Sequence, residues 1–161
     1  MAIIHVRIDE RLIHGQVATV WCNSLGASRI MVVNDEASKS DIQKSVLKMA
    51  TPPGVRLSVL TVDEAVKRIK SGRYDKDKVF MIFKMPKDCL RLIEAGIDIP
   101  ELNVGNMAYK EGATRVKRSV NVTGDDVEIF KKLHSMGVKM TARMIPDEPE
   151  NNFMDIIKGL L

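Results

Sequence analysis

Aromatic residues and cysteines are scarce in this chain. Phe, Trp and Tyr together make up 4% of the sequence, so aliphatic residues and ten methionines must supply most of a hydrophobic core. The two cysteines, Cys22 and Cys89, lie far apart within helical patterns and have no neighbours at metal-ligand spacing. We therefore interpret both as small buried hydrophobic residues, neither disulfide-bonded nor bound to a metal.

Long hydrophobic runs are absent as well. No apolar segment approaches the ~20 residues that a membrane-spanning helix needs. The first residues read directly as a strand and lack the layout of a secretory signal peptide. We therefore expect a cytoplasmic protein. A length of 161 residues fits one domain, 1–161, because domains commonly span roughly 100–200 residues.

Neither sign of charge dominates the composition. The formal net charge is +4, with 25 basic and 21 acidic residues. This modest excess suits an acidic or phosphorylated partner, but lysines scattered over solvated helix faces explain it equally well. We expect no nucleic-acid partner.

Common nucleotide and metal motifs are also missing. The chain has no Gly-x-Gly-x-x-Gly after its first strand and no Gly-x-x-x-x-Gly-Lys-Ser/Thr. A phosphatase-like cysteine–arginine pair fails, because six residues separate Cys22 from Arg29 and Cys22 lies inside a helical pattern. His5, His14 and His134 share no metal-ligand spacing. We predict no metal and no other cofactor, and we interpret His5 and His134 as structural.

What the chain does contain is a regular alternation of strand and helix patterns. The predicted strands are 3–9, 29–33, 55–60, 79–83, 102–105, 116–122 and 138–144. The predicted helices are 14–25, 38–50, 61–72, 86–96, 123–137 and 153–161. Potential capping boxes pair Ser38 with Asp41, Thr61 with Glu64 and Thr123 with Asp126.

This alternation predicts βαβ units joined by right-handed crossovers. The expected fold class is α/β, an open, mostly parallel twisted sheet of about seven strands with helices on both faces. Residues 116–122 place basic side chains between valines, which indicates an edge strand. In the first helix, Trp21 belongs to an apolar stripe with Val17 and Val20 and is expected in the core.

Residues 7–17 join the first strand to the first helix through a charged turn. Open α/β sheets place their sites beyond the carboxyl ends of the strands. His14 is the side chain of this turn suited to nucleophilic work near neutral pH. Arg11 and the free N–H groups of a helix start together form an anion site, and a phosphoryl group is its natural ligand. The backbone groups predicted to bind phosphate belong to Gly15, Gln16 and Val17.

A neutral imidazole at His14 could attack phosphorus and hold the phosphoryl group as a phosphoramidate. Arg11 would offset the charge of the oxygens, and Gly15 would let the backbone come close. Asp9 could orient the imidazole or hold Arg11 in position, and the residues alone leave both roles open. The plainer alternative is a histidine at a helix start that merely hydrogen-bonds a carboxylate.

The same segment carries a family resemblance. The sequence Arg7-Ile-Asp-Glu-Arg-Leu-Ile-His-Gly-Gln-Val17 closely resembles the phosphorylation-site signature of the IIB components of the mannose/fructose/sorbose family of the bacterial phosphotransferase system. Further matches are 18–19, Trp21, 29–36, 52–55, 102–107, 125–126, 130–133, Gly137 and 142–146. The resemblance therefore covers essentially the whole chain and implies an open, mainly parallel α/β fold.

The resemblance also implies a function. His14 would accept a phosphoryl group on Nδ1 from a phosphohistidine of a IIA protein, and would pass it to a sugar imported by the membrane components IIC and IID. Asp9 and Arg11 would be residues of the active-site loop. The turns at the ends of two other strands would border the site; they contain Asn34 with Asp35 and Gly105 with Asn106.

Two expectations about partners follow. Because the chain begins at the first IIB strand, it should use a separate IIA protein, and it should associate only transiently with the membrane permease. The alternative from a different functional class is a non-catalytic regulatory module of the same fold, which would bind a phosphorylated partner through Arg11 and the helix start.

Overall fold

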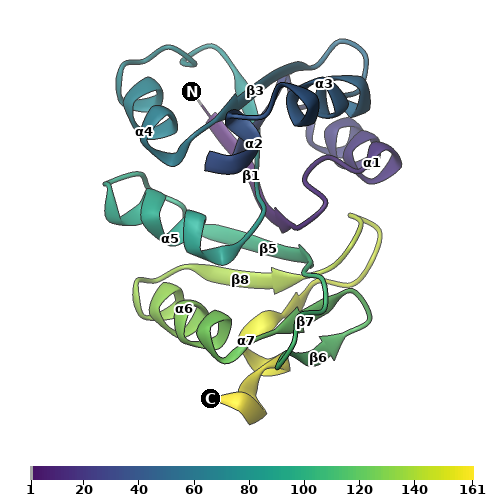
Figure 1. The fold of residues 1–161 in the computed structure, drawn as a ribbon, viewed down its shortest axis with the longest axis vertical. Coiled ribbons are helices and arrows are strands. Elements are labelled where there is room, and N and C mark those ends of the chain that lie inside the picture. Colours follow the sequence, from purple (N-terminus) through teal and green to yellow (C-terminus); the bar gives the residue numbers. More distant parts are fainter. Residues whose placement is uncertain (1) are drawn as a thin grey trace.

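The computed structural model describes residues 2–161, which form a large sheet with helices on both faces (Figure 1). Within this range the sheet has seven strands in the order β3-β2-β4-β1-β5-β8-β9. These strands are β1 (Ala2–Asp9), β2 (Arg29–Val33), β3 (Arg56–Leu60), β4 (Lys78–Phe83), β5 (Glu101–Asn106), β8 (Lys139–Ala142) and β9 (Asn151–Asn152). All neighbouring pairs are parallel except β8 and β9. The predicted open, mostly parallel sheet is confirmed.

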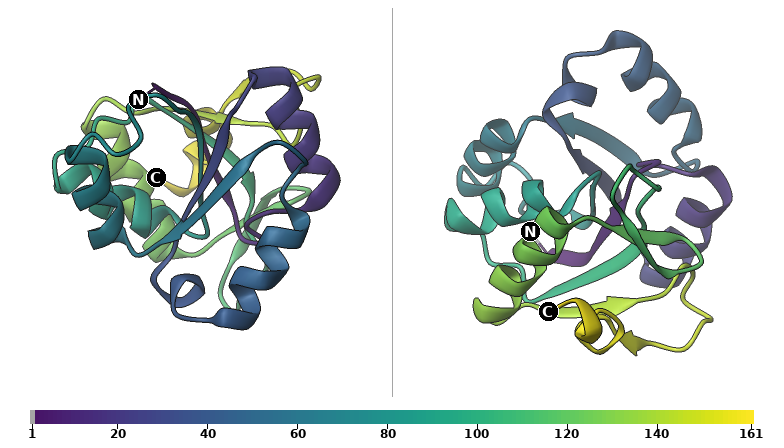
Figure 2. Two further views of the ribbon diagram at one scale, coloured as in Figure 1. Left: turned by 90° about the horizontal axis from the view of Figure 1, so that it is seen from above. Right: turned by 60° about the horizontal axis from the view of Figure 1, so that its bottom comes forward.

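The helices follow the strands along the chain. They are α1 (Gly15–Leu25), α2 (Asp35–Ser38), α3 (Asp41–Ala50), α4 (Val62–Lys70), α5 (Pro86–Glu94), α6 (Gly124–Ser135), α7 (Phe153–Ile156) and the 3-10 helix η1 (Lys158–Leu160). Figure 2 shows α1 and α3 on one side of the sheet and α4, α5 and α6 on the other. Within residues 2–161, no helix is both long enough and apolar enough to cross a membrane.

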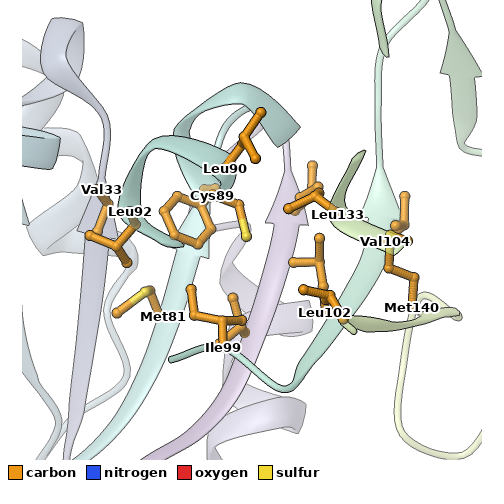
Figure 3. Packing of buried hydrophobic residues seen from close by; sticks show 14 of the residues in the cluster. Val33, Met81, Cys89, Leu90, Leu92, Ile99, Leu102, Val104, Leu133 and Met140 are labelled. Atoms are coloured by element: carbon orange, nitrogen blue, oxygen red, sulfur yellow. The ribbon is translucent and has the colours of Figure 1, made fainter. Parts of the chain in front are cut away.

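Successive side chains of the central strands point to opposite faces of the sheet, so each face has its own hydrophobic core. In β2, Ile30 and Val32 join a cluster that includes Trp21 of α1. Met31 and Val33, which point the opposite way, join the larger cluster beneath α4, α5 and α6 (Figure 3). Both cysteines are buried in these cores, as expected for small hydrophobic residues. A strand that is apolar on both faces is the expected result of covering a parallel sheet on both sides.

The connections that follow β1 and its neighbour β4 go to opposite faces of the sheet. The chain leaves β1 for α1 on one face, whereas the neighbouring strand β4 leads to α5 on the other face. Such a reversal opens a crevice outside the carboxyl ends of the strands. The turn after β1 lies at this crevice.

Two of the three predicted capping boxes are confirmed. The hydroxyl of Thr61 and that of Thr123 each accept a hydrogen bond from the N–H of the third residue of the helix, and the backbone N–H of each threonine donates the reciprocal bond to that residue's carboxylate. The box at Ser38 is wrong, because Ser38 ends the short helix α2 and its hydroxyl donates to the carbonyl of Asp35. Ser40 caps α3 instead, and its Oγ accepts from the N–H of Gln43 at 3.2 Å.

The predicted edge strand 116–122 is wrong. The segment folds into an antiparallel hairpin of β6 (Thr114–Lys117) and β7 (Val120–Val122), outside the large sheet. A turn at Arg118 and Ser119 reverses the chain, and the Ser119 hydroxyl donates to the Gly105 carbonyl at 2.8 Å. The hairpin is therefore fastened to the end of β5, and β9 takes the edge position beside β8.

Two smaller predictions also need correction. The helix predicted over 153–161 is divided at Ile157 into α7 and η1. Val20 does not join the buried stripe of α1, because it lies on the solvent side of the helix, whereas Trp21 is 1% exposed and belongs to the core as expected.

Candidate functional site

The turn after β1 is fixed by its apolar residues. The N–H of Leu12 donates to the carbonyl of Asp9 at 2.8 Å, which closes the turn. Leu12 has a φ of 63°, a left-handed conformation that is costly for a leucine. Burial of the Leu12 and Ile13 side chains beside α1 offsets this cost. The same geometry leaves Arg11 and His14 at the surface.

The Asp9 carboxylate organises the turn. It is 1% exposed, and its Oδ1 accepts from the backbone N–H and the Nε of Arg11, each at 3.0 Å. Its Oδ2 accepts from Arg11 Nη2 at 2.9 Å, so the guanidinium is held by two parallel hydrogen bonds. Of the two roles that the sequence left open for Asp9, these contacts support holding Arg11.

Arg7 is a second cation on Asp9 and lies wholly inside the protein. Its Nη2 is 3.3 Å from Asp9 Oδ2, and its Nη1 donates to Asn103 Oδ1 at 2.7 Å. Burial lowers the pKa of Arg7, and the Asp9 carboxylate opposes that shift. A Cβ at position 105 would overlap the guanidinium, so Gly105 provides the space that Arg7 occupies.

Met144 closes this cluster from a distant part of the chain. Its sulfur lies 3.2 Å from Arg7 Nη2 and 3.4 Å from Arg11 Nη2. Its carbonyl accepts from Trp21 Nε1 at 2.9 Å, which ties the loop after β8 to α1. Met144 and Asn103 lie in the matching segments 142–146 and 102–107, but neither was predicted to be a residue of the site. Arg7 could have been found, since it lies two residues before Asp9 on the same side of β1.

His14 caps α1 through its backbone. Its carbonyl accepts the first helical hydrogen bond, from the N–H of Ala18 at 2.9 Å. The N–H groups of Gly15, Gln16 and Val17 precede that bond and have no hydrogen-bond partner within residues 2–161. The imidazole is exposed and makes no capping hydrogen bond. An exposed imidazole beside free amides at the positive end of a helix suits an anionic ligand.

The two predicted border turns are placed differently. Asn106 lies beside the site, because β5 pairs with β1 and the Asn106 carbonyl accepts from the N–H of Glu10 at 3.1 Å. Asn34 and Asp35 follow β2, which β4 separates from β1. The Asn34 side chain caps α2, and the Asp35 carboxylate accepts from the N–H of Val62. These two side chains accept hydrogen bonds from backbone N–H groups at the starts of α2 and α4.

A basic pocket of about 480 Å³ adjoins the turn. It is lined by Gly105 and Asn106 at the end of β5, by Lys117 and Arg118 of the hairpin, and by Met144. Because the Met144 sulfur contacts Arg11, the pocket continues the surface formed by the Asp9–Arg11 pair. Cations at the mouth of the site attract a negatively charged group.

The family profile described as "PTS system sorbose subfamily IIB component" matches residues 3–160. The chain belongs to this family of phosphotransferase-system IIB components. The family resemblance noted in the sequence is thereby confirmed, and so is a place in sugar transport by the phosphotransferase system.

Individual relatives agree with this assignment. This IIB component is 38% identical over 154 residues to the sorbose-specific EIIB component of Lacticaseibacillus casei, covering 96% of this chain and 94% of the relative. It is 40% identical over 160 residues to the mannose-specific EIIAB component of Escherichia coli K12, covering 99% of this chain but 50% of that longer protein. The crystal structure of the IIBSor domain of the sorbose permease from Klebsiella pneumoniae matches with a TM-score of 0.95 and 34% identity, over 100% of this chain and 99% of that one.

Proposed function

We propose that this IIB component is a phosphocarrier that accepts a phosphoryl group on His14 from a IIA protein. It then passes the group to a sugar that the membrane components IIC and IID import. The observation that supports this most is the exposed His14 imidazole at the start of α1, next to unused backbone N–H groups and the Asp9-bound Arg11. A relative named EIIAB carries A and B components in one protein, which supports a IIA protein as donor.

The proposed transfer needs no machinery beyond this turn. The lone pair of His14 Nδ1 attacks phosphorus while the P–N bond of the donor phosphohistidine breaks and its electron pair returns to the donor imidazole. In the second step a sugar hydroxyl oxygen attacks phosphorus, the bond to His14 breaks, and the hydroxyl proton is released. Phosphoryl transfer depends mainly on in-line positioning and charge neutralisation, so an exposed turn is sufficient.

The charges of the turn favour a dianion. Arg7 and Arg11 share one carboxylate, Asp9, so the cluster carries a surplus of one positive charge. The N–H groups of Gly15, Gln16 and Val17 add the partial positive charge of a helix start. The arginines and these N–H groups would together stabilise the phosphoryl oxygens on His14. The N–H groups would have a hydrogen-bond partner only while the phosphoryl group is present.

The setting follows from the family. We propose that the protein works in the cytoplasm, alone or transiently docked on the permease. Relatives are named for sorbose, mannose, fructose and N-acetylgalactosamine, and the substrate proposed here is a sugar of this group.

Covalent labelling tests the proposal. The protein is incubated with phosphoenolpyruvate, the general phosphotransferase proteins and a matching IIA protein. We expect an acid-labile, alkali-stable phosphate on the wild-type chain and none on His14→Ala. Absence of label on wild type with competent partners would falsify the carrier function and favour a regulatory module that binds a phosphorylated partner without accepting its phosphate.

A further inference from the structure

Strand β3 ends the seven-stranded sheet, so it pairs with β2 on one side only. The N–H of Arg56 donates to the Ser28 carbonyl at 3.0 Å, so the backbone groups of Arg56 face the β2 side. Backbone groups of successive residues point to opposite sides of a strand, so the N–H and C=O groups of Leu57 and Val59 point outward. Such an open edge is a template for a further strand.

These outward groups have no hydrogen-bond partner in the part of the chain that the structure describes. The side chains of Leu57 and Val59 are half-buried and line a hollow of about 590 Å³ between β3 and α3. Pro52 and Pro53 also line this β3–α3 hollow, and Figure 1 shows α3 close to β3. The edge of β3 therefore offers free hydrogen-bonding groups beside an apolar surface.

The β3–α3 hollow is basic. Lys44 and Lys48 of α3 and Arg56 of β3 line it, and none of its described lining residues is acidic. Neither lysine forms a salt bridge or a side-chain hydrogen bond with any residue from 2 to 161. Arg56 is 74% exposed and lies 4.0 Å from the Asp77 carboxylate, which is a weak surface contact. Cations with weak partners or none, beside an apolar surface, favour a ligand that carries both acidic and apolar side chains.

We propose that the open edge of β3 binds an extended, acidic peptide segment of another protein, which adds to the sheet as a further strand. The backbone of the segment pairs with Leu57 and Val59. Its apolar side chains lie in the β3–α3 hollow, and its carboxylates lie near the three cations. This surface is separate from the turn that contains His14, because β2 and β4 lie between β3 and β1.

Other occupants fit the edge less well. A second copy of the chain would bring its own β3 edge, and with it the same three cations, against this one. A nucleic acid or an anionic lipid surface presents phosphate acceptors but no regular row of N–H donors. The outward carbonyls of Leu57 and Val59 would then gain no partner. A peptide strand supplies donors and acceptors at the spacing of the sheet.

Binding of a synthetic peptide tests the proposal. The probe is a short, fluorescently labelled peptide that alternates glutamate and valine, and fluorescence anisotropy gives its Kd for the intact protein. We expect saturable binding that weakens as salt is added. Two matched peptides should bind about tenfold more weakly or worse. One has lysine in place of glutamate, and the other is methylated at every backbone nitrogen and cannot donate hydrogen bonds.

Variants of the protein locate the bound peptide. Lys44→Glu/Lys48→Glu should raise the Kd about tenfold or more without touching a buried side chain. Lys67→Glu/Lys87→Glu makes the same change of charge at exposed positions of α4 and α5, on the other face of the sheet. At physiological salt this control should raise the Kd by no more than about twofold. Val59→Pro removes an outward N–H but no bond to β2 and should abolish binding, and the lysine variant keeps the proposal testable if the proline variant folds poorly.

Hydrogen exchange adds a readout for single residues. Binding of the glutamate–valine peptide should slow exchange of the Leu57 and Val59 amides about tenfold or more, because each N–H gains a partner. The amide of Ser58, which lies between them in the strand and faces β2, should change little.

Several results would overturn the inference. Absence of saturable binding to wild type removes the acidic peptide as a ligand. An unchanged Kd in Lys44→Glu/Lys48→Glu, or unchanged exchange at Leu57 and Val59, places the peptide elsewhere on the surface. Equal binding of the methylated peptide excludes strand addition. Tighter binding of a single-stranded RNA oligonucleotide, or of vesicles with anionic lipid, assigns the cations to that ligand, and a wild-type dimer in sedimentation velocity that Val59→Pro dissociates assigns the edge to a second copy.

Discussion

Asp9 links the interior of the sheet to the exposed turn. Its carboxylate is buried, which would be costly for a lone charge, but both oxygens accept from guanidinium groups. Arg7 donates to the carboxylate from the protein interior, and the same carboxylate accepts from Arg11 at the surface. Arg11 is thus held in place before any phosphate arrives, so little ordering entropy remains to be lost during transfer.

Arg11→Ala tests the part of this chain of contacts that faces the site. The fold should persist, because the Arg11 side chain is 34% exposed and Asp9 keeps Arg7 as a partner. The initial rate of phosphate transfer to His14 should fall about 10²-fold, the loss typical of removing one charge-stabilising donor. Arg73→Ala, between α4 and β4 at the opposite end of the sheet, is the matched control. A wild-type rate in Arg11→Ala would exclude Arg11 from the mechanism.

His5 makes stability depend on pH. Burial, with the nearby charges of Arg7 and Arg143, lowers its pKa from 6.5 to about 4. Between these values the unfolded chain binds more protons than the folded protein. The free energy of unfolding should therefore be highest above about pH 6.5 and should fall by up to about 3 kcal/mol as the pH drops toward 4.

Urea unfolding across this pH range measures the effect. His5→Phe keeps an aromatic ring against Trp21, on which the imidazole stacks with ring centroids 4.2 Å apart, and should flatten the pH dependence. His134→Gln, at an exposed position near the end of α6, should leave the dependence unchanged. An equally steep pH dependence in His5→Phe would show that another group titrates.

At the scale of elements, α1 serves two purposes. Its start supplies the free N–H groups of the candidate site, and its buried side fixes the loop after β8 through Trp21. That loop carries Met144, whose sulfur contacts both arginines of the Asp9 cluster. A change in the middle of α1 should therefore reach the site through the loop.

Trp21→Phe removes the hydrogen bond from Nε1 to the Met144 carbonyl while keeping an aromatic ring in the core. We expect the free energy of unfolding to fall by about 1–2 kcal/mol, because the partly buried Met144 carbonyl loses its hydrogen-bond partner. Hydrogen exchange in residues 143–148 should become faster. Val20→Ala, the exposed neighbour on the same helix, should change stability by less than about 0.5 kcal/mol. Equal effects of the two substitutions would contradict the role of Trp21.

At the scale of the whole molecule, the fold was predictable because its signals are local. Alternating and helical spacings are properties of short segments, and together they predicted a mostly parallel sheet covered on both faces. The hairpin of β6 and β7 was missed because its valines and basic residues are compatible with a single strand as well as with a hairpin. Its turn contains no glycine that would have marked the reversal of the chain. The left-handed Leu12 was missed because leucine rarely adopts that conformation.

The candidate site could be predicted only where its residues are close together in the sequence. The turn with Asp9, Arg11 and His14 is continuous in sequence, so its chemistry could be inferred from residue types and a helix start. Asn103 and Met144 contact Arg7 across 96 and 137 residues. Contacts of that range arise only from the order of the strands, which residue spacing does not encode. The exposed apolar side of α3 was likewise hidden, because its spacing is that of a buried helix face.

A chase experiment follows the phosphoryl group that His14 is proposed to carry between two partners. The chain is labelled with phosphate by its IIA protein, separated from it, and added to vesicles that contain the permease and a transportable sugar. We expect label to leave His14 and to appear in sugar phosphate at the same rate. Label that stays on the protein while the permease is competent would contradict the carrier function.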